Sequence, residues 1–176
     1  MAELEDLLQQ RLLDRPSKAL TMVVAAEAMV DGAVLDALFR LVYGGEDPLR
    51  WRVAWVLEKV SGERPSLVEG ERCALMQLAM QTDIPDGMCR LLLGILHNLP
   101  DVNTLDVPFF NFLLDRMCDL QSPPGVQSLA MKLACRMSRV DPELYREFLC
   151  ILRNMELDYY SAGVRAVVRH CLKNRK

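Results

Sequence analysis

Cysteine and histidine are the side chains of this sequence that could hold a metal or act as nucleophiles, and their spacing argues against both roles. The six cysteines lie far apart, at Cys73, Cys89, Cys118, Cys135, Cys150 and Cys171. No two of them form a Cys-x-x-Cys pair, and the only histidines, His97 and His170, have no paired ligand nearby, as a zinc site would require. Most of the cysteines lie among Leu, Met and Ala, where a free thiol packs as a small apolar side chain. We therefore expect no metal site and no disulfide.

The sequence also lacks the arrangements that support catalysis. His170 and Cys171 are adjacent, but consecutive side chains on a helix point about 100° apart, so we predict a buried Cys171 and an exposed His170. Gly44-Gly45 stands alone, without the Gly-Lys-Ser/Thr run of a phosphate-binding loop. No Gly-x-Ser-x-Gly turn presents a nucleophilic serine. We expect a protein that is not an enzyme, with no catalytic residue and no cofactor.

A basic stripe near the C-terminus is the feature of the sequence that most resembles a binding site. Arg165, Arg169 and Lys173 follow the spacing i, i+4, i+8, which places them on one face of a helix. Residues 161–176 hold these three, Arg175 and Lys176 and no acid, so the rest of a chain with net charge −3 carries −8. The stripe is either the polar outer face of a terminal helix, where cations suit the helix dipole, or a docking surface. In the second case the partner is acidic, and it could be another copy of this chain.

Helices are the elements that must position these residues. Hydrophobic residues make up 51% of the sequence and aromatic residues 6%, and an abundance of Leu, Ala and Met without strand-like alternation favours helices. Pro, Gly and Asp divide the chain into about ten helical segments with short connections, which make neighbouring helices antiparallel. We expect Asp47 to cap the fourth helix, Pro65 to open a fifth that continues to Ala79, and Leu120 to belong to the seventh.

A repeat is visible in the positions where helices begin. Pro48, Asp86 and Pro124 are each 38 residues apart, and a period near ~40 with two helices per unit is typical of an α-solenoid. Between Leu49 and Val60 one apolar stripe lies opposite Trp51 and Trp55, as in an internal helix that needs neighbours on both sides. We expect Trp55 and Leu57 to be largely buried. The prediction is a single repeat domain over residues 1–176, with terminal helices near 2–13 and 161–173 as caps.

Several segments resemble HEAT-like repeat proteins, and in particular a group of small bacterial HEAT-like chains. They are Trp51–Glu58, Ala130-Met131, Pro142-Glu143-Leu144, Ser161-Ala162-Gly163 and Arg165. The resemblance implies an all-α, α-α superhelix of the HEAT-like solenoid type. Some chains of this group are labelled adenylosuccinate lyase, but the Ser-Ser-x-Met-Pro-x-Lys-x-Asn loop of that superfamily is absent, and the chain is too short for its fold.

Two functions remain open at this point. The first is a non-enzymatic scaffold that binds an unknown protein partner through a curved surface, an expectation that rests on architecture. The second is a HEAT-like DNA-binding or DNA-glycosylase-type protein, in which Trp51 and Trp55 stack on bases and Arg50 and Arg52 contact phosphate. The net charge of −8 outside the C-terminal segment makes nucleic acid the weaker hypothesis. We interpret the Trp pair as packing between helices and the two arginines as surface residues.

The expected location is the cytoplasm, without a membrane anchor. The first residues, Met1 to Asp6, are acidic and are not followed by the apolar stretch of a secretory signal. No apolar run approaches the ~20 residues that span a bilayer.

The cysteine pattern gives a direct test. Because every thiol is expected to be reduced, titration of the denatured protein under non-reducing conditions should find all six thiols. A smaller count, or stoichiometric zinc in the purified protein, would contradict the prediction.

Overall fold

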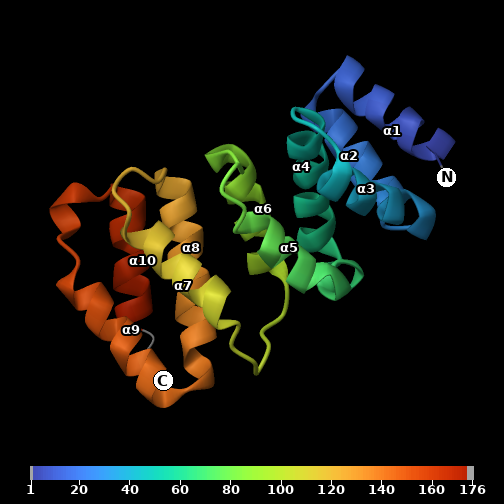
Figure 1. The fold of residues 1–176 in the computed structure, drawn as a ribbon. Coiled ribbons are helices and arrows are strands. Elements are labelled where there is room, and N and C mark those ends of the chain that lie inside the picture. The colour runs from blue at the N-terminus through green and yellow to red at the C-terminus, as the bar shows by residue number, and fades with distance from the viewer. Residues whose placement is uncertain (1, 174–176) are drawn as a thin grey trace. The chain divides into compact units, whose positions relative to one another are not determined.

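The computed structural model describes residues 2–173, which form ten α-helices and no strand (Figure 1). The all-α fold class predicted from the sequence is confirmed. The helices are α1 (Ala2–Asp14), α2 (Lys18–Ala28), α3 (Gly32–Gly44), α4 (Leu49–Glu63), α5 (Arg72–Ala79), α6 (Asp86–Asn98), α7 (Val107–Cys118), α8 (Pro124–Met137), α9 (Pro142–Asn154) and α10 (Ala162–Lys173). Four short 3-10 turns join them: η1 (Pro65–Leu67), η2 (Glu69–Glu71), η3 (Ser138–Val140) and η4 (Leu157–Tyr159).

The chain divides into two compact units. The first, Met1–Leu99, contains α1 to α6, and the second, Pro100–Lys176, contains α7 to α10. The predicted period is visible in where helices begin, because α4, α6, α8 and α10 start at Leu49, Asp86, Pro124 and Ala162. These starts are 37, 38 and 38 residues apart. That both units act as a single domain stays a prediction.

Short polar side chains begin several of the helices. The Ser17 hydroxyl accepts a hydrogen bond from the backbone N–H of Leu20 (3.1 Å) at the start of α2. The Asp106 carboxylate accepts from the N–H of Phe109 (2.8 Å) at the start of α7. These side chains satisfy backbone donors that have no partner within the helix, and so they fix where each helix begins.

Three local predictions are wrong. The helix expected from Pro65 to Ala79 breaks into η1, η2 and the short α5, and Gly70 in the middle of η2 explains the break, because glycine disfavours helix. Asp47 does not cap α4, whose N-cap is Pro48 after a cis Asp47–Pro48 bond. Leu120 lies beyond α7, which ends at Cys118, and is exposed in the following turn.

In the first unit, α4 packs between α2 and α6. Two glycines of α6 lie under two large side chains of α4. A Cβ at Gly87 would lie 3.3 Å from the Trp51 ring nitrogen, and one at Gly94 would lie 3.3 Å from the Glu58 carboxylate. Each pair is 36 residues apart, so α4 and α6 run parallel at close approach. The interpretation of Trp51 as packing between helices is confirmed.

The second unit repeats this register. Helices α8 and α10 pack together, and the thiols of Cys135 and Cys171, again 36 residues apart, share a hydrogen bond between them. Within each unit, one helix thus packs on the helix that begins about 38 residues later, which is the packing expected of a helical repeat.

Arg50 and Arg52 are not solvated surface residues, contrary to the sequence interpretation. The Arg50 guanidinium donates to the carbonyl of Val42 near the end of α3 (3.2 Å). Arg52 donates to the carbonyls of Leu12 and Leu13 at the end of α1 (2.7 and 2.9 Å). The last carbonyls of a helix have no partner within it, so both arginines stabilise helix ends.

The core of the first unit contains Leu57, which is completely buried in α4, whereas Trp55 is only half-buried. The expectation of extensive burial therefore holds for Leu57 alone. Among residues 2–173, no helix is long and apolar enough to cross a membrane.

Leu57→Ala should lower the free energy of unfolding by about 2–5 kcal/mol, because it removes buried methyl groups and leaves a cavity between α4 and its neighbours. Chemical denaturation of the full chain measures the change. Leu7→Ala is the matched control, since Leu7 is half-exposed on α1, and it should change stability by only about 0.5 kcal/mol. Equal midpoints for the two variants would refute the internal position of α4.

Candidate functional site

The predicted basic stripe lies on α10, and its three residues differ in their exposure to solvent. Arg169 and Lys173 are exposed, whereas Arg165 is half-buried and donates to the carbonyl of Tyr160 (2.9 Å). Arg175 and Lys176 lie outside the described residues. Arg165 therefore has a structural role in the turn before α10, and the side chains of Arg169 and Lys173 remain accessible for a partner.

The cysteines are dispersed over both units. None of the six is in a disulfide, and residues 2–173 contain no group of three or more potential metal ligands. The hydrogen bond from Cys171, together with the charge of Arg139, lowers the pKa of Cys135, and the same bond raises the pKa of Cys171. Both thiols are buried between α8 and α10, which makes them packing residues. As predicted, Cys171 is buried and His170 is exposed.

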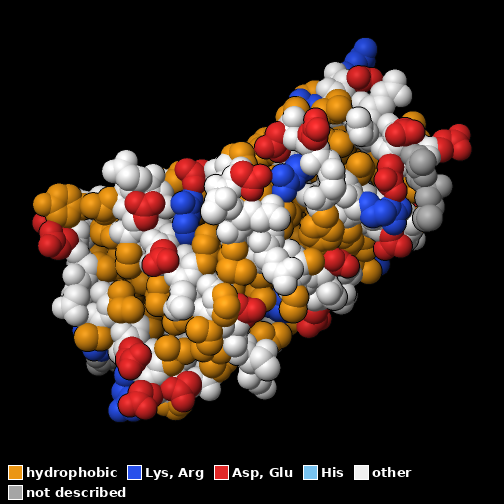
Figure 2. Space-filling view, in the orientation of Figure 1, with side chains coloured by type: hydrophobic (Ala, Val, Ile, Leu, Met, Phe, Trp, Pro, Cys, Tyr) orange, Lys and Arg blue, Asp and Glu red, His pale blue; other side chains and the backbone are white. Residues whose placement is uncertain are grey.

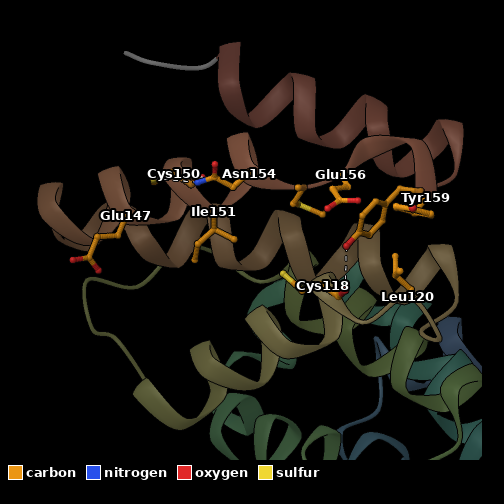
Figure 3. Close-up of a pocket in the computed structure, with 10 residues that line it drawn as sticks. Cys118, Leu120, Glu147, Cys150, Ile151, Asn154, Glu156 and Tyr159 are labelled. Carbon is orange, nitrogen blue, oxygen red and sulfur yellow. Dashed lines mark hydrogen bonds between the residues drawn. The ribbon is translucent and has the colours of Figure 1, made fainter.

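A groove of about 850 Å³ in the second unit is the strongest candidate site. One wall is the end of α7 and the turn that follows it, and the other wall is α9 with the η4 connector (Figure 3). It is lined by Cys118, Leu120, Glu147, Cys150, Ile151, Asn154, Met155, Glu156, Tyr159 and Tyr160. In Figure 2 the visible face of this unit carries many apolar side chains with acidic ones among them.

The groove is apolar with acidic residues in its walls. Leu120 and Tyr159 are 52% and 70% exposed, which is unusual for side chains of this size. Ile151 and Met155 extend the apolar surface. Glu147 and Glu156 add two carboxylates, and among the described residues that line the groove none is Lys or Arg. The groove therefore combines apolar surface with negative charge.

The Leu120 wall is fixed by hydrogen bonds around Asp119. Its carboxylate accepts from the backbone N–H of Gln121 (2.9 Å) and from the hydroxyl of Ser122 (2.9 Å). The buried Gln127 amide donates to the carbonyl of Asp119 (2.8 Å). The turn therefore presents Leu120 in a defined position although its side chain is exposed.

The opposite wall is fixed through Tyr160. Its hydroxyl donates to the carbonyl of Cys118 (3.1 Å), the dashed line in Figure 3, and its own carbonyl accepts from Arg165. Burial, together with the nearby groups of Cys118 and Asp119, raises the pKa of Tyr160, so the hydroxyl keeps its proton and can donate. These bonds connect the end of α7 to the connector before α10.

One thiol of the groove, that of Cys118, is held in its protonated form. Desolvation of its sulfur, together with the Asp115 carboxylate, raises the pKa of Cys118. The thiol therefore stays protonated at neutral pH, and it is the thiolate that acts as a nucleophile.

The sequence interpretation missed this groove. Much of its lining comes from the turn after α7 and from the η4 connector, and the sequence pattern marks both only as boundaries between helices. Leu120 in particular is predicted to belong to the seventh helix. A signal was available, because Leu120 stands between Asp119 and Ser122-Pro123, and Tyr159-Tyr160 is an aromatic pair in a short connector. Large apolar residues in turns indicate either a buried connector or a docking surface.

The fold defines an all-helical repeat protein, and the groove is its candidate site. A family model described as a HEAT repeat domain matches residues 7–175, and the chain belongs to the HEAT repeat family. Repeat domains of this kind generally serve as scaffolds for interaction. Neither the curated proteins nor the solved structures include a match to the chain.

The turn at Asp119 should respond to acid. The hydrogen bonds from Gln121 and Ser122, with the charge of Arg116, lower the pKa of Asp119 below its ordinary value of 3.8. The ionised carboxylate therefore stabilises the turn fully above about pH 3.8. This stabilisation is lost as the pH falls through the lower pKa of the folded state. In an NMR titration, the Gln121 amide proton should shift with a midpoint below 3.8. Ser122→Ala should raise that midpoint, because it removes one donor, and a wild-type midpoint at or above 3.8 would contradict the arrangement.

Proposed function

We propose that this protein is a non-catalytic scaffold whose groove between α7 and α9 binds a short segment of a partner protein. The segment carries large apolar side chains flanked by Lys or Arg. The observation that carries the proposal is the lining of the groove, in which apolar side chains lie beside Glu147 and Glu156 and no described lining residue is basic.

Each part of the lining favours a particular feature of the partner. Leu120, Ile151 and Tyr159 offer apolar surface that a helix with one apolar face can cover. The two glutamates favour cations beside that face and disfavour acids, so they contribute to specificity and to the rate of association. Because hydrogen bonds hold both walls, little ordering is needed on binding, which improves affinity.

The charge of the groove argues against the nucleic-acid hypothesis. Binding to a phosphate backbone requires a basic surface, whereas the groove offers carboxylates. Trp51, half of the pair considered as a stacking platform, packs on Gly87 of α6. Arg50 and Arg52 are engaged with helix ends. The exposed Arg169 and Lys173 remain a candidate surface for an acidic protein partner.

A model peptide tests the groove. A labelled helical peptide of leucine and lysine, with leucines along one face, should bind the full chain in a fluorescence polarisation titration. The same peptide with glutamate in place of lysine should bind at least about tenfold more weakly, since each 1.4 kcal/mol is a factor of ten. Tyr159→Ala should also weaken binding by about tenfold, as expected for a central aromatic contact, and should leave the unfolding midpoint unchanged because Tyr159 is exposed.

Charge reversal supplies the matched control. Glu147→Lys with Glu156→Lys should abolish the preference for the cationic peptide. Asp36→Lys with Glu63→Lys, two exposed acids of the first unit, makes the same change in net charge and should leave the preference intact. Equal effects of the two double variants would show that net charge alone attracts the peptide. Salt-dependent retention on duplex DNA would favour the nucleic-acid hypothesis instead.

A further inference from the structure

Two thiols meet where α8 and α10 pack side by side (Figure 1). Cys135 lies near the end of α8 and Cys171 near the end of α10. The S–H of Cys171 donates a hydrogen bond to the sulfur of Cys135. Only 5% of Cys135 and 2% of Cys171 is exposed. A disulfide requires two cysteines whose Cβ atoms converge, and sulfurs already joined by a hydrogen bond are close to that arrangement.

A cation also contacts the sulfur of Cys135. Arg139, one helical turn later in η3, donates a hydrogen bond to it. The guanidinium lies over the ring of Tyr145, 5.6 Å from the ring centre. The hydrogen bond from Cys171 and the charge of Arg139 lower the pKa of Cys135, whereas the same bond raises the pKa of Cys171. Because the thiolate is the reactive form of cysteine, Cys135 is the nucleophile of the pair and Cys171 keeps its proton.

We propose that Cys135 and Cys171 form a redox-active dithiol, which hydrogen peroxide converts into a disulfide between α8 and α10. The thiolate sulfur of Cys135 attacks one oxygen of the peroxide, the O–O bond breaks, and the products are a sulfenic acid and hydroxide. The sulfur of Cys171 then attacks the sulfenic sulfur and loses its proton, and the S–O bond breaks with release of water. With the proton that Cys135 gave up earlier, two thiols and one hydrogen peroxide yield one disulfide and two waters.

The surroundings of Cys135 favour a small oxidant. Arg139 is exposed although it contacts the sulfur, so the sulfur is separated from solvent by one side chain on that side. Hydrogen peroxide is little larger than water and needs only a small displacement of this side chain. A disulfide such as oxidised glutathione is too bulky to reach a buried sulfur. Oxidation by peroxide is therefore the reaction that fits this site.

The disulfide would join α10, the last helix of the described residues, to α8. The loop that it closes contains α9 and η4, and closing a loop removes conformational freedom from the unfolded chain. The oxidised protein should therefore resist unfolding better than the reduced protein. Without an oxidant, both thiols stay reduced and pack as apolar side chains. The inference goes beyond the proposed function and needs no partner in the groove, so that either can fail without the other.

Peptide mapping detects the disulfide in a full chain that keeps only its buried cysteines. The exposed ones are replaced by serine: Cys73, Cys118 and Cys150. Hydrogen peroxide should then join the peptides that contain Cys135 and Cys171, and the oxidised chain should unfold at a higher denaturant concentration. Cys89, which is as deeply buried in α6, is the internal control and should keep its thiol. Peroxide that leaves Cys135 and Cys171 as free thiols, or that oxidises Cys135 without linking it to Cys171, would overturn the proposal.

Two substitutions test the role of each residue. Cys171→Ser should leave the sulfenic acid of Cys135 without a second thiol, so a cyclic dione that reacts with sulfenic acids should label Cys135. Arg139→Gln should slow disulfide formation several-fold, because it removes the cation that stabilises the thiolate. Arg146→Gln, the same change at an exposed arginine of α9, is the matched control and should leave the rate unchanged. Equal rates in the two arginine variants, or an unlabelled Cys135 in the serine variant, would contradict the assignment of Cys135 as the nucleophile.

Discussion

The structure depends on helices that must be packed on two opposite faces. Helix α4 is the clearest case, because Val53, Val56, Leu57 and Val60 are all buried while Trp51 lies over Gly87 on the α6 side. A helix of this kind is stable only between two neighbours. The glycines of α6 allow the close approach, and the offset of 36 residues between contacting positions follows from it. The same offset joins Cys135 to Cys171, so one packing rule operates in both units.

Two connectors and the exposed side of α9, rather than the fully packed helices, carry the candidate binding chemistry. Helices such as α6 are buried on nearly every side and have little surface to offer. In the second unit, the turn after α7 and the η4 connector hold Leu120 and Tyr159 in solvent. Their positions are fixed by backbone carbonyls that accept from Gln127, Tyr160 and Arg165. Rigid scaffolds commonly place function on such loops.

The repeat architecture could be predicted because periodicity is a local property of the sequence, and the starts at Asp86 and Pro124 were located correctly. The groove could not be predicted from the sequence, because it depends on which segments lie side by side in the folded chain. The same holds for the hydrogen-bond partners of three arginines, Arg50, Arg52 and Arg165, which could not be predicted from the sequence either. Their type and position indicate surface charge, but each donates to a carbonyl at a helix end or in a turn. Nothing in the spacing of an arginine shows which carbonyl lies within its reach.

Helices α2 and α10 differ in the side chains that they expose to solvent. A terminal helix of a repeat array needs a polar outer face to remain soluble. Helix α10 meets this requirement with the exposed Arg169 and Lys173. The outer face of α2 carries the exposed Met22 and Val23 instead, with Lys18 and the Arg11–Glu27 ion pair at its sides. The exposed cations of α10 suit an acidic surface, whereas the outer face of α2 offers mainly apolar side chains.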